Sequence, residues 1–117
     1  MEQWVLVERK TYHTLIMQDI NVEELKSRRD QGENLLVIDV REPHEYEEYN
    51  IGGKLISLGT LPGMLDELED LKETEFVVHC RSGARSANAK AFLESVGFSK
   101  VRNLIGGVME WQAKYPN

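Results

Sequence analysis

The stretch that decides the fold is Val77-Val78-His79-Cys80-Arg81-Ser82-Gly83-Ala84-Arg85-Ser86. Its first residues continue the apolar segment 76–78, which is typical of a buried strand in a parallel sheet. After the loop, small residues recur at helical spacing, at Ala84, Ala87, Ala91 and Ser95. The stretch therefore predicts a strand, a short loop and a helix, with the only cysteine of the chain where the strand ends.

This position favours a reactive thiolate at Cys80. The first amides of a helix and the positive end of its dipole attract an anion, and the side chains of Arg81 and Arg85 add positive charge. In such surroundings the pKa of a cysteine falls to roughly 3.5–7.5, from about 8.5 for the free thiol. Gly83 fits because a loop that turns its amides inward needs a residue free to adopt positive φ. The alternative is a buried structural cysteine, but the arginines, serines and glycine that follow are poor core residues.

Strand and helix signals alternate along the chain, which is the pattern of a parallel sheet covered by helices on both faces. Five short strands are expected: one ending at Ile20, then 35–38, 55–58, 76–79 and 101–104. Asn21 is the expected N-cap of a first helix that ends at Gly32. Further helices are expected at 43–49, 64–71, 84–97 and around Trp111.

Three segments resemble one family, the single-domain rhodaneses, or thiosulfate sulfurtransferases. The run from Cys80 to Ser86 is similar to the active loop of the family, residues 38–46 resemble its first signature, and residues 106–111 resemble its closing Gly-Gly-x-x-x-Trp element. The similarity extends from about Ile20 to Trp111. It implies a rhodanese-like three-layer α/β fold, with a mostly parallel five-stranded sheet and helices on both faces.

The resemblance implies a transferase that moves sulfane sulfur from a donor such as thiosulfate to a thiophilic acceptor, through a persulfide on Cys80. Arg81 and Arg85 would hold the small anionic donor, while inward amides stabilise the thiolate and the persulfide. No cofactor is required. The substrate-binding residues would be those after the cysteine: Arg81, Ser82, Gly83, Ala84, Arg85 and Ser86.

A narrower resemblance rests on residues 49–59. Asn50 stands where the family more often has histidine, and this version looks like the rhodanese domain at the carboxyl end of E1-like enzymes that activate molybdopterin-synthase and thiamine sulfur carriers. It implies a ubiquitin-like sulfur-carrier protein and an E1-like activating enzyme as possible partners.

Two other classes of function stay open. A cysteine phosphatase uses the same strand, loop and helix, but it spaces its cysteine and arginine by five residues, whereas residues 81–84 are the only ones between Cys80 and Arg85. A loop one residue shorter favours a single sulfur atom over a tetrahedral phosphate. The second alternative is a rhodanese-like binding module without turnover, which the intact loop disfavours.

Other conspicuous residues near the loop are expected to be structural. Asp39 and Arg41 are predicted to form an ion pair beside the site, although at the carboxyl end of a strand either could contact substrate. His79 should point to the face of the strand opposite Cys80. Three glutamates are expected to form a solvated face: Glu45, Glu47 and Glu48. Four glycines are expected to lie in turns: Gly52, Gly53, Gly106 and Gly107.

Bulk composition agrees with a small cytoplasmic enzyme. The 117 residues suffice for one domain, and the net charge of −6 argues against a nucleic-acid partner. Three distant histidines and one cysteine give no metal spacing, and no apolar run reaches the roughly 20 residues of a membrane span. With a single cysteine, no internal disulfide can form.

The chain divides into an N-terminal extension, 1–17, and a rhodanese-like domain, 18–117. The extension is either a linker remnant or a hairpin of strands 4–7 and 13–16, with Arg9-Lys10-Thr11 between them.

Overall fold

A parallel sheet forms the centre of the computed structural model, which describes residues 4–9 and 12–116. Its strand order is β4-β3-β5-β6, with β3 at Leu36–Asp39, β4 at Lys54–Leu55, β5 at Phe76–His79 and β6 at Val101–Asn103. Beyond β6, Ile20 forms a parallel bridge with Leu104. The expected parallel α/β fold is confirmed, and its fifth strand is reduced to this single bridge.

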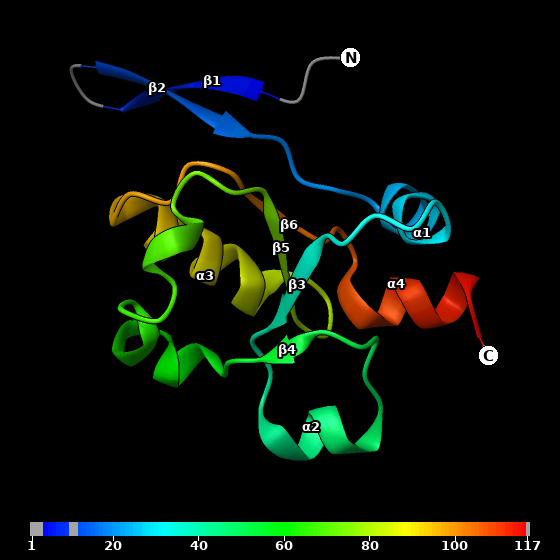
Figure 1. The fold of residues 1–117 in the computed structure, drawn as a ribbon. Helices are drawn as coiled ribbons and strands as arrows, with labels where there is room; N and C mark the ends of the chain where they lie inside the picture. The colour runs from blue at the N-terminus through cyan, green and yellow to red at the C-terminus, as the bar shows by residue number, and fades with distance from the viewer. Residues whose placement is uncertain (1–3, 10–11, 117) are drawn as a thin grey trace.

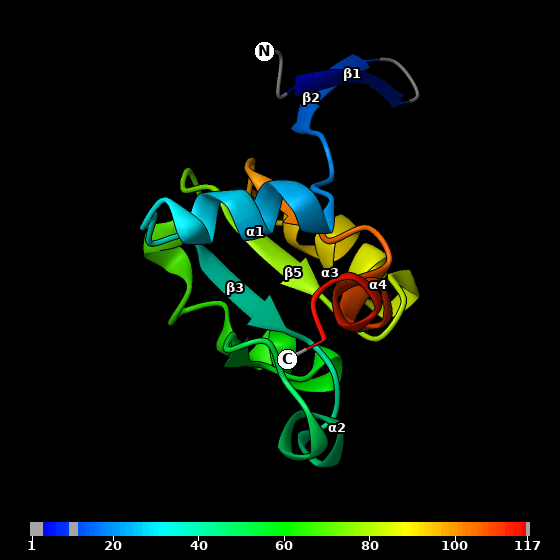
Figure 2. The ribbon, with the colours of Figure 1, turned by 90° about the vertical axis from the view of Figure 1, so that its right-hand side faces the viewer.

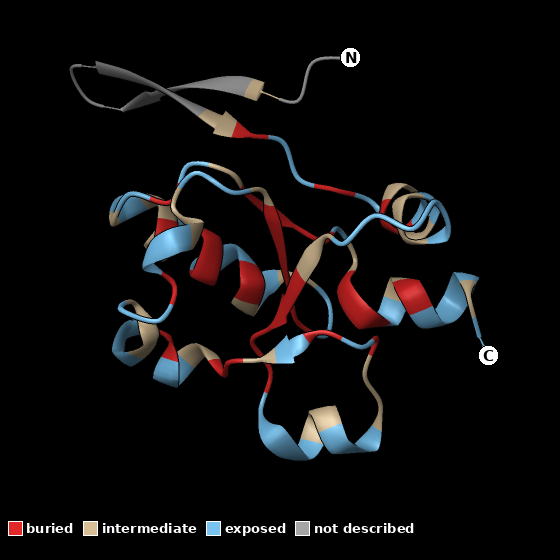
Figure 3. Ribbon diagram, viewed as in Figure 1, coloured by how far each residue is buried: buried red, intermediate tan, exposed pale blue. Residues whose placement is uncertain are grey.

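Helices cover both faces of the sheet, as Figures 1 and 2 show. Ile38 and Val78 pack on the side of α3 (Ala84–Ser95), whereas Val37 and Val77 pack on the side of α1 and α4. β5, β6 and most of β3 are therefore buried on both faces, whereas β4 at the edge of the sheet is exposed at its first residue (Figure 3). The other helices are α1 at Val22–Asp30, α2 at Pro43–Glu48 and α4 at Gly107–Lys114.

The prediction of an α-helix at 64–71 is wrong. Two 3₁₀ helices occupy this part of the chain, η1 (Leu58–Met64) and η2 (Glu69–Leu71). Pro62 lies inside η1, before the range of the expected helix. Leucines three residues apart, such as Leu65, Leu68 and Leu71, also fit the period of a 3₁₀ helix, in which side chains at i and i+3 eclipse.

The strand expected at 55–58 is shorter than predicted, because only Lys54–Leu55 pairs with β3. The cap of the first helix is as expected: the side chain of Asn21 accepts a hydrogen bond from the amide of Glu24 at 2.7 Å. Pro43 starts α2, where a missing amide proton costs no helical hydrogen bond.

An antiparallel hairpin precedes the domain and extends away from the sheet (Figure 1). Its strands are β1 (Trp4–Arg9) and β2 (Tyr12–Met17), and Lys10 and Thr11 lie outside the described residues. The Lys90 ammonium donates to the carbonyl of Met17 at 2.8 Å, which ties the end of β2 to α3. Among the helices of the described residues, none has the length and apolar character needed to span a membrane.

Candidate active site

The Sγ atom of Cys80 sits in a ring of hydrogen-bond donors. Cys80 follows β5 directly, and α3 begins four residues later, so residues 80–86, called here the cysteine loop, turn at the carboxyl edge of the sheet. The amide of Gly83 lies 3.1 Å from Sγ, the amide of Ser86 3.4 Å and the hydroxyl of Ser86 3.3 Å. Gly83 caps α3 with φ 122°, a conformation that directs its amide inward.

These donors lower the pKa of Cys80. Burial favours the neutral thiol and raises the pKa, since the residue is only 1% exposed, but hydrogen bonds from the Ser86 hydroxyl and from the amides of Ser86, Gly83 and Ser82 outweigh that effect. The sequence pointed to the same amides, and it also pointed to the charges of Arg81 and Arg85. In the structure, hydrogen bonds from the loop itself are the main cause.

The single proton of the Ser86 hydroxyl is shared between Sγ of Cys80 and an acceptor on the neighbouring strand. The Oγ atom of Ser86 lies 2.6 Å from Oδ1 of Asn103, at the end of β6, and Nδ2 of Asn103 donates to the carbonyl of Gly83 at 3.2 Å. Asn103 therefore joins the loop to the neighbouring strand. Sequence reasoning missed this residue, because nothing in the local pattern around Asn103 links it to the cysteine loop.

Replacing Ser86 with alanine should raise the pKa of Cys80, because the substitution removes the hydroxyl hydrogen bond to the thiolate. The rate of Cys80 alkylation, followed against pH, should therefore reach its midpoint at higher pH. At mildly acidic pH the variant reacts more slowly than wild type, and at alkaline pH, where both thiols are ionised, the difference shrinks.

Ser82→Ala is the matched control, since it deletes a hydroxyl from the same loop and keeps the Ser82 amide. An alkylation profile of Ser86→Ala that coincides with those of wild type and Ser82→Ala would contradict the role given to the Ser86 hydroxyl.

The role expected for Arg85, holding the anionic donor, differs from its place in the structure. Its guanidinium forms two hydrogen bonds with the Glu45 carboxylate of α2, at 2.7 and 2.9 Å, instead of standing free to hold an anion. These bonds lower the pKa of Glu45 to about 2 and raise the pKa of Arg85. The expectation that Glu45 belongs to a solvated face is wrong, because its carboxylate is paired with Arg85. The two residues are 40 positions apart in sequence.

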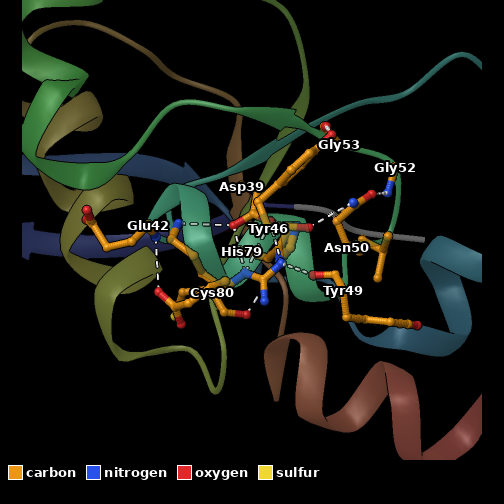
Figure 4. A network of polar contacts seen from close by, with 12 residues as sticks. Asp39, Glu42, Tyr46, Tyr49, Asn50, Gly52, Gly53, His79 and Cys80 are labelled. Carbon is orange, nitrogen blue, oxygen red and sulfur yellow. Dashed lines mark hydrogen bonds and ion pairs between the residues drawn. The ribbon is translucent and has the colours of Figure 1, made fainter.

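The ion pair predicted between Asp39 and Arg41 is present and buried (Figure 4). Arg41 also donates to the carbonyl of Tyr49 at 2.7 Å, so the pair connects the end of β3 to the segment after α2. His79 lies beside it, with Nε2 3.7 Å from the Asp39 carboxylate. Burial lowers the pKa of His79 and keeps the ring neutral, and its side chain forms none of the hydrogen bonds to Sγ described above.

The N-terminus of α4 holds the cysteine loop from the side away from Sγ. The amides of Val108 and Met109 donate to the carbonyls of Cys80 and Arg81, at 3.0 and 2.9 Å. Gly107 permits this approach, because a Cβ atom there would lie 2.5 Å from the Cys80 carbonyl oxygen. With its carbonyls engaged by α4, the loop turns its amides toward Sγ. Sequence reasoning assigned Gly107 only to a turn.

A cavity of about 240 Å³ opens beside the cysteine loop. Met109, 49% exposed, forms part of its wall together with charged residues of α2 and of the loop. The lining residues are Arg41, Glu45, Glu48, Tyr49, Arg81, Val108, Met109 and Gln112. Across the described ranges 4–9 and 12–116, no three His, Cys, Asp or Glu side chains are grouped in a way that could hold a metal ion.

The structure thus brings together Cys80, Gly83 and Ser86 around one sulfur atom. Arg81 lines the cavity, Arg85 is paired with Glu45, and Ala84 is the first residue of α3. The backbone amide of Ser82 donates a hydrogen bond to Cys80. Asp39 and Arg41 form a buried pair, and Arg41 also lines the cavity.

Comparison with known proteins identifies the family. The profile of the Rhodanese-like domain matches residues 21–114. A sulfurtransferase from Allochromatium vinosum is 34% identical over 82% of this chain and 89% of that protein. The human single-domain sulfurtransferase TSTD1 has a similar structure, with a TM-score of 0.72 and 27% identity over 82% of this chain and 96% of that one.

The narrower resemblance also finds a counterpart. The probable adenylyltransferase/sulfurtransferase MoeZ of Mycobacterium tuberculosis is 34% identical over 79% of this chain, which spans 24% of the MoeZ sequence. Sequence profile, relatives and structural neighbours agree on one family. The chain belongs to the rhodanese-like domain family.

Proposed function

We propose that this protein is a sulfurtransferase that carries sulfane sulfur as a persulfide on Cys80. The observation that carries the proposal is the set of three donors within 3.4 Å of the only thiol of the chain. A thiolate held in this way is a nucleophile at neutral pH. The same donors stabilise the negative charge of the Cys80 thiolate before sulfur arrives and that of the persulfide afterwards.

The reaction has two balanced steps. The Cys80 thiolate attacks the outer sulfur of thiosulfate, the sulfur–sulfur bond of the donor breaks, and sulfite leaves with the bonding electron pair. An acceptor thiolate or thiocarboxylate, or cyanide, then attacks the terminal sulfur of the persulfide, and Cys80 leaves as thiolate. Electrons and charge balance in each step, so the proposal calls for no cofactor.

Two features favour sulfur transfer over phosphate-ester hydrolysis. The cysteine loop is one residue shorter than that of a cysteine phosphatase, as the sequence indicates. In addition, the guanidinium of Arg85 is paired with Glu45, whereas a phosphatase needs that group for the phosphate. The lowered pKa of Cys80 likewise favours an enzyme over a module that only binds.

We further propose a ubiquitin-like sulfur carrier as acceptor, with an E1-like enzyme to adenylate its carboxylate. The similarity to MoeZ supports this, because the name of that protein joins an adenylyltransferase with a sulfurtransferase. The cavity beside the loop is open to solvent and could admit a flexible Gly-Gly tail. The terminal sulfur of the persulfide attacks the adenylated carboxylate and AMP leaves, which explains the need for adenylation. An external thiol then cleaves the acyl disulfide formed with Cys80, so that the thiocarboxylate is released and the thiol is oxidised to a disulfide.

The test offers one loaded protein several substrates. Protein incubated with thiosulfate should convert cyanide to thiocyanate, should convert an adenylated carrier to its thiocarboxylate when the E1-like enzyme, ATP and a thiol reductant are present, and should leave aryl phosphates intact. Absence of thiocyanate, or efficient phosphatase turnover, would overturn the function. Thiocyanate without any mass gain on the carrier would overturn the proposed partner only.

A further inference from the structure

Two of the three arginines near the cavity already have carboxylate partners. Arg41 is paired with Asp39, and Arg85 is paired with Glu45. Arg81, which lines the cavity, has no ion pair among the described residues. The cavity wall also carries two carboxylates, Glu45 and Glu48, so the charges of its lining cancel. A site of this kind offers a dianion little net attraction.

Glu45 is fixed in its place. Its carboxylate also accepts a hydrogen bond from the amide of Glu42 at 3.0 Å, as part of the capping box of α2. The side chain of Glu45 is 20% exposed and lines the cavity, and that of Arg85 is 37% exposed. Because Arg85 lowers the pKa of Glu45 to about 2, the carboxylate is charged at neutral pH.

From this geometry we infer that Glu45 is a specificity-determining residue, which neutralises Arg85 and directs the site away from dianionic sulfur donors toward donors with one negative charge. The inference rests on the proposed function and names the donor class of the same site. A donor with one negative charge needs only one cation, such as Arg81, at the entrance.

Two probes of nearly equal size separate the classes. Thiosulfate is a dianion, and the methanethiosulfonate anion replaces one of its charged oxygens with a methyl group. Each loses its outer sulfur to the Cys80 thiolate by cleavage of one sulfur–sulfur bond, and the leaving groups are sulfite and methanesulfinate. The quantity compared is kcat/KM for each donor, measured as thiocyanate formation at saturating cyanide and low ionic strength.

Glu45→Gln should shift the ratio of kcat/KM, thiosulfate over methanethiosulfonate, about fivefold toward thiosulfate, because one repulsive charge at the entrance acts on one extra charge of the donor. The amide oxygen of glutamine can still accept the hydrogen bond from Glu42. The shift should shrink as salt is added. Glu47→Gln is the matched control, since this exposed carboxylate of the same helix does not line the cavity.

Arg85→Gln and the double variant complete the cycle. The single Arg85→Gln variant leaves the Glu45 carboxylate unpaired and should move the ratio away from thiosulfate, while the double variant should return it near the wild-type value. If both donors load Cys80 and Glu45→Gln changes their ratio no more than Glu47→Gln does, the inference is overturned. If neither donor loads Cys80 in any variant, the proposed function fails, and the inference falls with it.

Discussion

Replacing Cys80 with serine is expected to reduce sulfur transfer to cyanide by on the order of 10⁴-fold or more, to the uncatalysed background. A hydroxyl in the same position stays protonated, and it cannot form a persulfide. Serine nearly matches cysteine in size, and its oxygen can accept the hydrogen bonds of Gly83 and Ser86 that now reach Sγ. The fold should therefore survive, which a thermal melt close to that of wild type would verify.

Because the chain has no second thiol, no other residue can replace Cys80 as carrier. Thiocyanate formation by Cys80→Ser at a rate comparable to wild type would mean that sulfur passes directly from donor to cyanide, and the covalent mechanism would be wrong.

The second large effect is expected for Gly107→Ala. At φ 57° an alanine pays a conformational cost of about 1–2 kcal/mol, and its Cβ would lie 2.5 Å from the Cys80 carbonyl oxygen and 2.6 Å from that of Arg81. The start of α4 must move away, and the loop loses the amides that hold its carbonyls. We expect a loss of about 2–4 kcal/mol in unfolding free energy and about 100-fold in kcat/KM.

Gly32→Ala is the control that separates backbone strain from steric contact of the added Cβ atom. Gly32 also has a positive φ, 83°, but a Cβ there would meet nothing within 4 Å. Denaturant unfolding and thiocyanate assays of both variants give the comparison. Equal losses for the two substitutions would show that close packing of α4 on the loop is not what keeps the site in order.

Most of the sheet could be predicted from sequence because β3, β5 and β6 are largely buried on both faces. Phe76, Val77 and Val78 form a short apolar run, and both faces of this strand are packed in the structure. The segment from Leu58 to Leu71 could not be predicted as well, because its leucine spacing suits an α-helix and a 3₁₀ helix alike. There tertiary packing of Leu61 and Leu68 decides the outcome.

The candidate site divides in the same way. Cys80, Gly83 and Ser86 could be found because a strand, a loop and a helix follow one another in sequence, and local geometry turns the amides inward. The partners that set the charge and shape of the site come from elsewhere. Glu45 is 40 residues from Arg85, and Asn103 is 17 residues from Ser86, so no local pattern links them.

The persulfide on Cys80 is tested most directly by the intact mass of the protein before and after thiosulfate, and again after cyanide. We predict that thiosulfate adds the mass of one sulfur atom to the wild-type chain, that cyanide removes it as thiocyanate, and that Cys80→Ser gains nothing. An unchanged mass of the wild-type protein while thiocyanate is being formed, or a sulfur adduct that persists in the serine variant, would contradict the mechanism.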